Sequence, residues 1–146
     1  MNNYEEVETL VKKVEIGKTI RKRQANYELV DAYWNIGKLV VDAQGGKAKS
    51  KYGDALLKEW SEKLSKEYGK GYDYSNLRRF RQFYLTFSIC GTVCRNLSWS
   101  VIKILLPIKD TNKRNYYYNL CNENNLSVRE LKRQIDNKFY ERLEHK

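Results

Sequence analysis

Proline is nearly absent from this chain, which has 146 residues and one proline, Pro107. A proline inside a helix removes a hydrogen bond and clashes with the preceding turn, so glycine is the main residue that interrupts the helical patterns here. Apolar residues recur at spacings of three and four along most of the sequence. We therefore expect an all-α fold, a helical bundle, with at most a small β wing at 88–97, where no periodicity is clear and the chain could form a loop or a short hairpin.

Two helices are expected before the first loop. Residues 4–16 place Val7, Leu10, Val11 and Val14 on one face, and this helix is expected to end near Gly17. Residues 18–43 carry apolar stripes on two sides, which predicts a helix that is buried on both. Gly37 in this helix costs about 1 kcal/mol relative to alanine, so we expect a close helix crossing there as compensation.

Residues 52–87 contain two helical patterns that are separated by glycines. The basic loop 45–51 precedes them, the first pattern covers residues 54–68, and residues 69–71 end it. Ser75 is a good N-cap for a second helix, whose apolar side extends to Phe87. The sequence therefore predicts a helix-turn-helix unit at about 52–87.

Shorter helices are expected after residue 97. Ser98, followed by Trp99, is expected to begin a helix that ends at Pro107. Asp110 can cap another helix that extends to Cys121. Ser127, with Glu130, forms a capping box before a helix. Its apolar stripe is Leu131, Ile135, Phe139 and Leu143. This organisation predicts a helical domain over 1–126 and a C-terminal helix over 127–146.

The charge is strongly basic, with 28 Lys and Arg against 18 Asp and Glu and a net charge of +10. Such a balance favours polyanions, through long-range attraction and through release of counterions from phosphates. Residues 47–83 contain ten Lys or Arg against five Asp or Glu, which is half of the excess of the whole chain. The positive charge is thus concentrated where the helix-turn-helix unit is expected.

On a helical wheel of residues 75–87, the aromatic stripe faces inward while Arg78 and Gln82 point directly away from it. Arginine pairs with guanine and glutamine with adenine in the major groove, so this face suits double-stranded DNA. The residues expected to contact the groove are Ser75, Arg78, Arg79, Arg81 and Gln82, and those expected to neutralise phosphates are Lys47, Lys49, Lys51 and Lys66. Two alternatives stay open, a merely solvated basic face and an acidic protein partner.

The sequence offers little for catalysis. His145 is the only histidine and lies at the terminus, and no glycine-rich phosphate loop is present. Cys90 and Cys94 have a loose metal-ligand spacing but no companion ligands. We expect no catalytic residues, no metal and no cofactor. Because no apolar run is long enough to span a membrane and no signal peptide is visible, we expect a cytoplasmic protein with no membrane partner.

An ordered set of motifs extends over residues 18–143. The motifs are Arg23-Gln24-Ala25-Asn26, Tyr33-Trp34-x-Ile36-Gly37, Ser75-x-Leu77-x-x-Phe80-Arg81-x-Phe83-Tyr84, Leu97-Ser98-Trp99-Ser100, Arg114-x-x-Tyr117, Leu126-Ser127-Val128-Arg129-Glu130-Leu131-x-Arg133-Gln134-Ile135-Asp136 and Tyr140-Glu141-Arg142-Leu143. Each motif alone is weak, but their order is fairly specific. Together they resemble the N-terminal domain of the YhcG-like family.

The resemblance implies a winged-helix-like DNA-binding module that is normally followed by a C-terminal PDDEXK nuclease domain. It implies that the helix over 127–146 would lead into that nuclease domain, which is absent from this chain, so that the chain itself is not an enzyme. Family members usually carry a histidine directly after the Ser-Trp-Ser motif. This chain has Val101 at that position.

A different class of function is an assembly module that does not bind nucleic acid. The helices expected at 18–43 and 127–143 have apolar faces that could pair two subunits as a homodimer or dock another protein. The two functions are compatible, because helix-turn-helix proteins commonly dimerise to read two half-sites.

Overall fold

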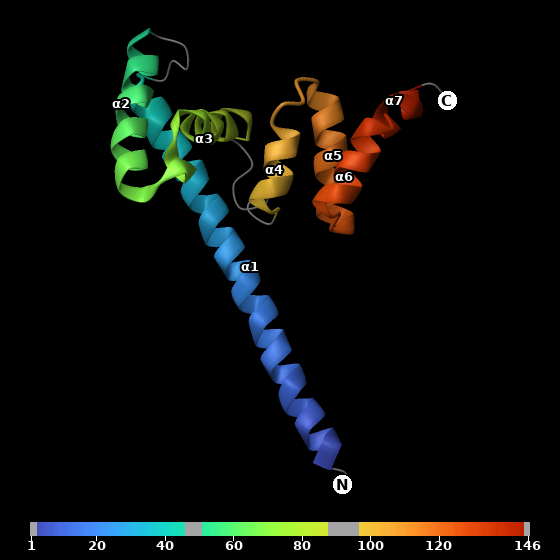
Figure 1. Cartoon of the computed structure of the whole chain (residues 1–146). Helices are drawn as coiled ribbons and strands as arrows, with labels where there is room; N and C mark the ends of the chain where they lie inside the picture. The colour runs from blue at the N-terminus through green and yellow to red at the C-terminus, as the bar shows by residue number, and fades with distance from the viewer. Residues whose placement is uncertain (1–2, 46–50, 88–96, 145–146) are drawn as a thin grey trace.

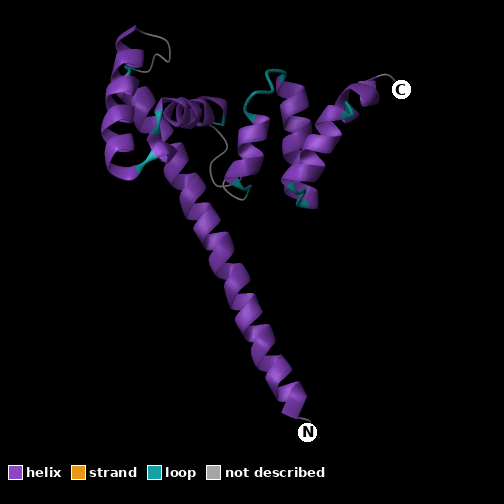
Figure 2. Ribbon diagram, in the orientation of Figure 1, coloured by secondary structure: helices purple, strands orange, loops and turns teal. Residues whose placement is uncertain are grey.

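The computed structural model describes residues 3–45, 51–87 and 97–144, and these ranges contain helices and no strand (Figure 2). The elements in chain order are α1 (Asn3–Ala43), α2 (Lys51–Tyr68), the 3-10 helix η1 (Lys70–Tyr72), α3 (Tyr74–Thr86), α4 (Trp99–Leu105), α5 (Thr111–Asn124), α6 (Val128–Asp136) and α7 (Phe139–Glu144) (Figure 1). The expectation of an all-helical fold is confirmed. The segment where a β wing was considered lies, except for Leu97, outside the described residues.

Helix α1 is one continuous helix of 41 residues, so the expected end at Gly17 is wrong. A glycine inside a helix costs only about 1 kcal/mol, and ion pairs support the turns on either side of Gly17. The Lys12 ammonium lies 3.3 Å from Glu8 Oε1, and the Lys18 ammonium lies 3.4 Å from Glu15 Oε1. The helix ends instead before Gly45, which has a φ of 70°, a backbone conformation that glycine adopts without strain.

Helices α2 and α3 occupy the region expected for the helix-turn-helix unit, and Gly69 and η1 connect them. Gly69 has a φ of 97°, which suits glycine and ends α2. The N-cap of α3 is Asp73 and not the expected Ser75, because the Asp73 carboxylate accepts a hydrogen bond of 2.9 Å from the Asn76 amide. Helix α3 therefore begins two residues earlier than the serine suggested.

Helix α3 crosses α1 at Gly37, where the sequence predicted a close crossing. A Cβ atom added at Gly37 would lie only 2.0 Å from the Phe80 carbonyl oxygen, so no larger residue fits without a shift of backbone. Beside the crossing, the Tyr33 and Phe80 rings stack with centroids 4.2 Å apart. The buried residues of α3 are Leu77, Phe80 and Phe83. This contact fixes the direction of α3 relative to α1.

The C-terminal helices begin at the residues that the sequence predicted. Ser98, Asp110 and Ser127 are the N-caps of α4, α5 and α6, and the side chain of each accepts a hydrogen bond from a backbone amide of the first turn. The expectation of one helix from 127 to 143 is wrong, because Lys138 has a φ of 56° and separates α6 from α7. The break is stabilised by the Tyr117 hydroxyl, which accepts a 3.2 Å hydrogen bond from the Tyr140 amide.

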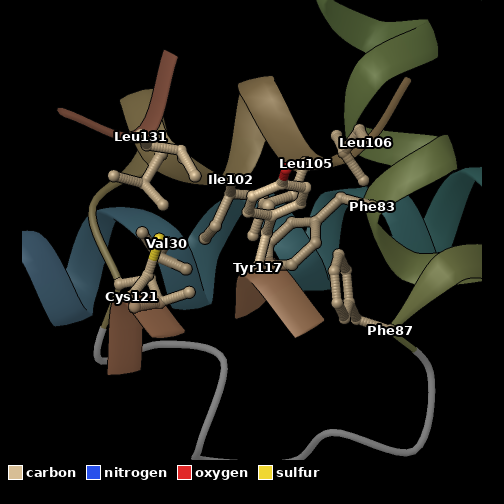
Figure 3. Close-up of a cluster of buried hydrophobic side chains, with 11 residues drawn as sticks. Val30, Phe83, Phe87, Ile102, Leu105, Leu106, Tyr117, Cys121 and Leu131 are labelled. Carbon is tan, nitrogen blue, oxygen red and sulfur yellow. The ribbon is translucent and has the colours of Figure 1, made fainter. Parts of the chain in front are cut away.

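Two clusters of buried side chains hold the helices together, and the C-terminal half of α1 contributes to both. Figure 3 shows the larger cluster, where side chains from α1, α3, α4, α5 and α6 point toward one another. Its labelled members are Val30, Phe83, Phe87, Ile102, Leu105, Leu106, Tyr117, Cys121 and Leu131. The second cluster contains Val40, Leu57, Leu77 and Phe80. The N-terminal half of α1 extends away from both (Figure 1).

Candidate nucleic-acid interface

Two cations gather around one aromatic ring where α2 and α3 lie side by side. The Lys58 ammonium of α2 lies 6.0 Å from the centroid of the Tyr74 ring, and the Arg78 guanidinium carbon of α3 lies 5.6 Å from it. Both distances fall within the range of cation–π attraction. Tyr74 is the first residue of α3 and is half-buried, so the junction of the two helices presents a partly buried ring with two cations near it.

The two cations at this junction, Lys58 and Arg78, have no ion-pair partner among the described residues. Lys113 differs from these two cations, because its ammonium lies 2.6 Å from Glu141 Oε1 of α7. That hydrogen bond raises the pKa of Lys113 and lowers the pKa of Glu141. The junction of α2 and α3 thus keeps positive charge that a bound anion could use.

Three of the predicted groove-contacting residues lie on the exposed side of the first two turns of α3. Ser75, Arg78 and Arg79 are all exposed. The Arg79 guanidinium donates a 3.2 Å hydrogen bond to the side-chain oxygen of Asn76, one turn earlier, which limits its motion along the helix. These three residues therefore lie together on one exposed face near the start of α3.

Arg81 and Gln82 make contacts within the protein that the helical wheel did not predict. The Arg81 side chain is only 11% exposed, and its Nη1 lies 3.9 Å from the Asp54 carboxylate of α2. The Gln82 amide nitrogen donates a 3.1 Å hydrogen bond to the carbonyl of Leu106, at the end of α4. A wheel describes one helix alone, so it could not show that α2 and α4 approach these two positions. Both side chains help to hold α3 in place.

Two of the four lysines that were predicted to neutralise phosphates lie within the described residues. Lys66 is exposed near the end of α2. Lys51 is the first residue of α2, while Lys47 and Lys49 lie outside the described residues. Lys66 thus lies on the same helix as Lys58.

Tyr74 and Lys58 are the members of this surface that the predicted contact set omitted. A signal for Tyr74 was present in the sequence, because Tyr74 and Arg78 are four residues apart and such pairs meet on a helix. The contact of Lys58 with the same ring had no local signal, since it depends on how α2 packs beside α3.

Val101, where the resemblance implies that a histidine is usual, faces the protein core. Its side chain is only 5% exposed and lies in the larger buried cluster. Its backbone amide donates to the Ser98 hydroxyl at the N-cap of α4. The valine therefore removes no group from the exposed surface of α3, and the cations around Tyr74 are unaffected by it.

Among the described residues, no three cysteines, aspartates or glutamates form a group that could hold a metal ion. Cys121 is buried among apolar side chains, and this burial raises the pKa of its thiol to about 11. The thiol therefore stays protonated near neutral pH, so it is not an activated nucleophile. Cys90, Cys94 and His145 lie outside the described residues.

Among the described helices, none combines the length and the apolar character that crossing a membrane requires.

Comparison with known proteins agrees with the resemblance that the ordered motifs indicated. Residues 9–142 match the family described as DUF1016 N-terminal domain. A protein of Escherichia coli (strain K12) with the name "Putative nuclease YhcG" is 30% identical to this chain. That match covers 88% of this chain and 43% of the relative, so the chain spans less than half of the relative's length. No solved structure matches the chain.

Proposed function

Because the chain belongs to the DUF1016 N-terminal domain family, we propose that it is a non-catalytic module that binds double-stranded DNA for a nuclease-type protein. The observation that carries the proposal is the convergence of Lys58 and Arg78 on the Tyr74 ring, at an exposed junction without a neutralising carboxylate among the described residues. The net charge of +10 and the name of the E. coli relative support the choice of a nucleic acid over other anions.

In this proposal α2, η1 and α3 act as the helix-turn-helix unit, and α3 is the recognition helix. Helix α3 is held against α1 by its buried face, which fixes the angle at which its other face meets the groove. Arg78 and Arg79 contact base edges or phosphates from the first two turns. Ser75 donates its hydroxyl to a phosphate near the start of the helix, where the helix dipole also favours an anion.

The remaining predicted residues act around this centre. Lys66, together with Lys47, Lys49 and Lys51, neutralises phosphates on either side of the groove, as the sequence predicted. Arg81 and Gln82 act as positioning residues, because their hydrogen-bonding groups face Asp54 and the Leu106 carbonyl. We expect their replacement to disturb the placement of α3 as well as its charge.

Cleavage of DNA is not part of this proposal. The chain matches 43% of the length of the E. coli relative, and the described residues contain no metal-binding group of the kind that nucleases use. We expect the isolated chain to bind duplex DNA without cutting it when Mg²⁺ is added.

The test compares two double variants that remove the same charge. Arg78→Ala with Arg79→Ala alters the proposed interface, while Arg129→Ala with Lys132→Ala removes two exposed cations of α6. Affinity for a labelled duplex is measured by fluorescence anisotropy between about 50 and 200 mM salt, where binding to phosphates weakens steeply. We expect a loss of about tenfold or more for the α3 variant, a salt slope that falls by about 2, and less than twofold loss for the α6 variant.

Three results would contradict the proposal. These are no affinity for duplex DNA, an affinity that does not change with salt, and equal losses for the two double variants. The last result would mean that binding depends on total charge and not on the surface of α3.

Self-association is the second candidate function, because several apolar side chains stay exposed on α1. A homodimer was expected through apolar faces on helices 18–43 and 127–143. The exposed apolar side chains on these faces are mainly Leu29, Leu39 and Leu143. Other members of those faces, Val30, Val41 and Leu131 among them, are buried inside the chain. The larger exposed apolar surface lies between residues 4 and 20.

A further inference from the structure

Within the described chain, residues 5–25 in the N-terminal half of α1 do not pack against another helix. This half extends away from the other helices in Figure 1, where it is drawn in blue. No residue in this range is buried, and the first buried position of the helix is Val30. The side chain of Asn26 marks the boundary, since its amide donates a 3.1 Å hydrogen bond to the Leu97 carbonyl.

An apolar stripe lies along this exposed half. Val7, Leu10, Val11 and Val14 have exposed fractions of 55%, 62%, 51% and 53%. Their spacings of three and four place them on one face of the helix. Helical segments in water are stabilised mainly by packing of such a face, so a helix that extends this far with its stripe uncovered lacks its usual source of stability. This stripe, Val7–Leu10–Val11–Val14, is therefore a surface that a binding partner would cover.

The charges along the same half indicate which occupant fits. Residues 5–8 carry three glutamates and no cation. Residues 12–23 carry six cations, Lys12, Lys13, Lys18, Arg21, Lys22 and Arg23, against the single carboxylate of Glu15. The segment is therefore acidic at one end and basic at the other, with the apolar stripe across the change of sign.

We propose that this half of α1 pairs with the same half of a second copy of the chain, in antiparallel orientation. Antiparallel pairing covers the apolar stripe of each copy with that of the other, and it places the glutamates at residues 5–8 within about one helical turn of Lys12, Lys13 and Lys18 of the second copy. Parallel pairing would place like charges together at both ends. Because the other helices attach only to the C-terminal half of α1, the two bundles lie at opposite ends of the pair and do not collide (Figure 1).

The first test measures the mass of the full chain by sedimentation equilibrium, without DNA, over about 1 to 200 μM. The variant Leu10→Gln with Val14→Gln makes the stripe polar while keeping a residue that favours helix. The matched control is Leu29→Gln with Leu39→Gln, which changes two exposed apolar side chains in the other half of the same helix. We expect dimers for the original chain and for the control, and a dissociation constant at least tenfold higher for the stripe variant.

Circular dichroism at a concentration where both variants are monomeric, with the same spectrum and the same unfolding transition, shows that neither has lost its fold. A monomer at every concentration for the original chain, or equal weakening in both variants, would overturn the proposal. Binding of the stripe to a different protein, with no self-association, would overturn it too. Because no DNA is present, this result is independent of the proposed DNA binding.

The second test determines the orientation. A spin label is placed at Lys22→Cys in a chain with Cys90→Ser and Cys94→Ser, while Cys121 is buried and does not react. At a rise of about 1.5 Å per residue, an antiparallel pair centred on the stripe separates the two labels by about 35 Å. A parallel pair brings them to about 10–15 Å, close to one helix diameter. The shorter distance would contradict the antiparallel arrangement.

Discussion

The two halves of α1 have a similar spacing of apolar side chains, but only the C-terminal half packs against other helices. Residues 26–43 lie under α3 and α4, bury Val30 and Val40, and approach the backbone of α3 at Gly37. Residues 4–25 have the same helical spacing of aliphatic side chains, yet none of these side chains is buried. The spacing alone therefore determines that the segment is a helix, while the crossing of another helix decides whether its apolar face is used inside the chain.

Gly17 and Gly37 lie in different halves of α1, and the largest expected effect comes from substituting Gly37. Gly37→Ala would bring a Cβ atom to 2.0 Å from the Phe80 carbonyl oxygen, so α3 must move away from α1. We expect a loss of about 3 kcal/mol in the free energy of unfolding, measured by urea denaturation, because overpacking against backbone outweighs the gain in helix propensity. An unchanged free energy of unfolding would mean that α1 and α3 are not held in this crossing.

Two valines, one in each half of α1, test whether only the C-terminal half is packed. Val30 is fully buried, whereas Val14 is 53% exposed. Val30→Ala should lower the free energy of unfolding by about 2 kcal/mol, because it removes buried methyl groups and leaves a cavity. Val14→Ala should change it by less than about 0.5 kcal/mol at a concentration where the chain is monomeric. Equal losses for the two variants would show that the N-terminal half packs against the rest of the chain.

The smallest expected effect has the opposite sign. A Cβ atom at Gly17 would meet only the end of the Arg21 side chain, at 3.1 Å, and that side chain can rotate away. Gly17→Ala should therefore raise the free energy of unfolding by up to about 1 kcal/mol, since alanine favours the helix. Thermal unfolding followed by circular dichroism measures the gain. A loss of stability would reveal a close neighbour of Gly17 other than Arg21.

The features that the sequence predicted well are local. Ser98, Asp110 and Ser127 begin helices because each cap needs only its own side chain and the next turn of backbone. The crossing at Gly37 was also expected from the cost of a glycine inside a helix, although Gly17 has the same cost and no crossing.

The features that the sequence could not predict depend on neighbours that are distant along the chain. Gly17 and Gly37 have the same intrinsic cost, and only the path of α3 distinguishes them. Arg81 and Gln82 lie on the polar side of α3, but Asp54 and the Leu106 carbonyl approach them from other helices. The candidate surface around Tyr74 could be anticipated through Arg78, whereas its second cation, Lys58, needed the packing of α2 beside α3.

The length of α1 has a consequence for how far apart two copies can act. At about 1.5 Å per residue, the proposed antiparallel pair would hold its two Gly37 crossings, and with them the two α3 helices, about 80 Å apart. Dimeric helix-turn-helix proteins that read adjacent half-sites separate their recognition helices by only about 34–36 Å. The uninterrupted helix would thus serve as a molecular ruler, which sets two α3 helices more than two turns of duplex apart and favours bridging distant segments of DNA over reading one short palindrome.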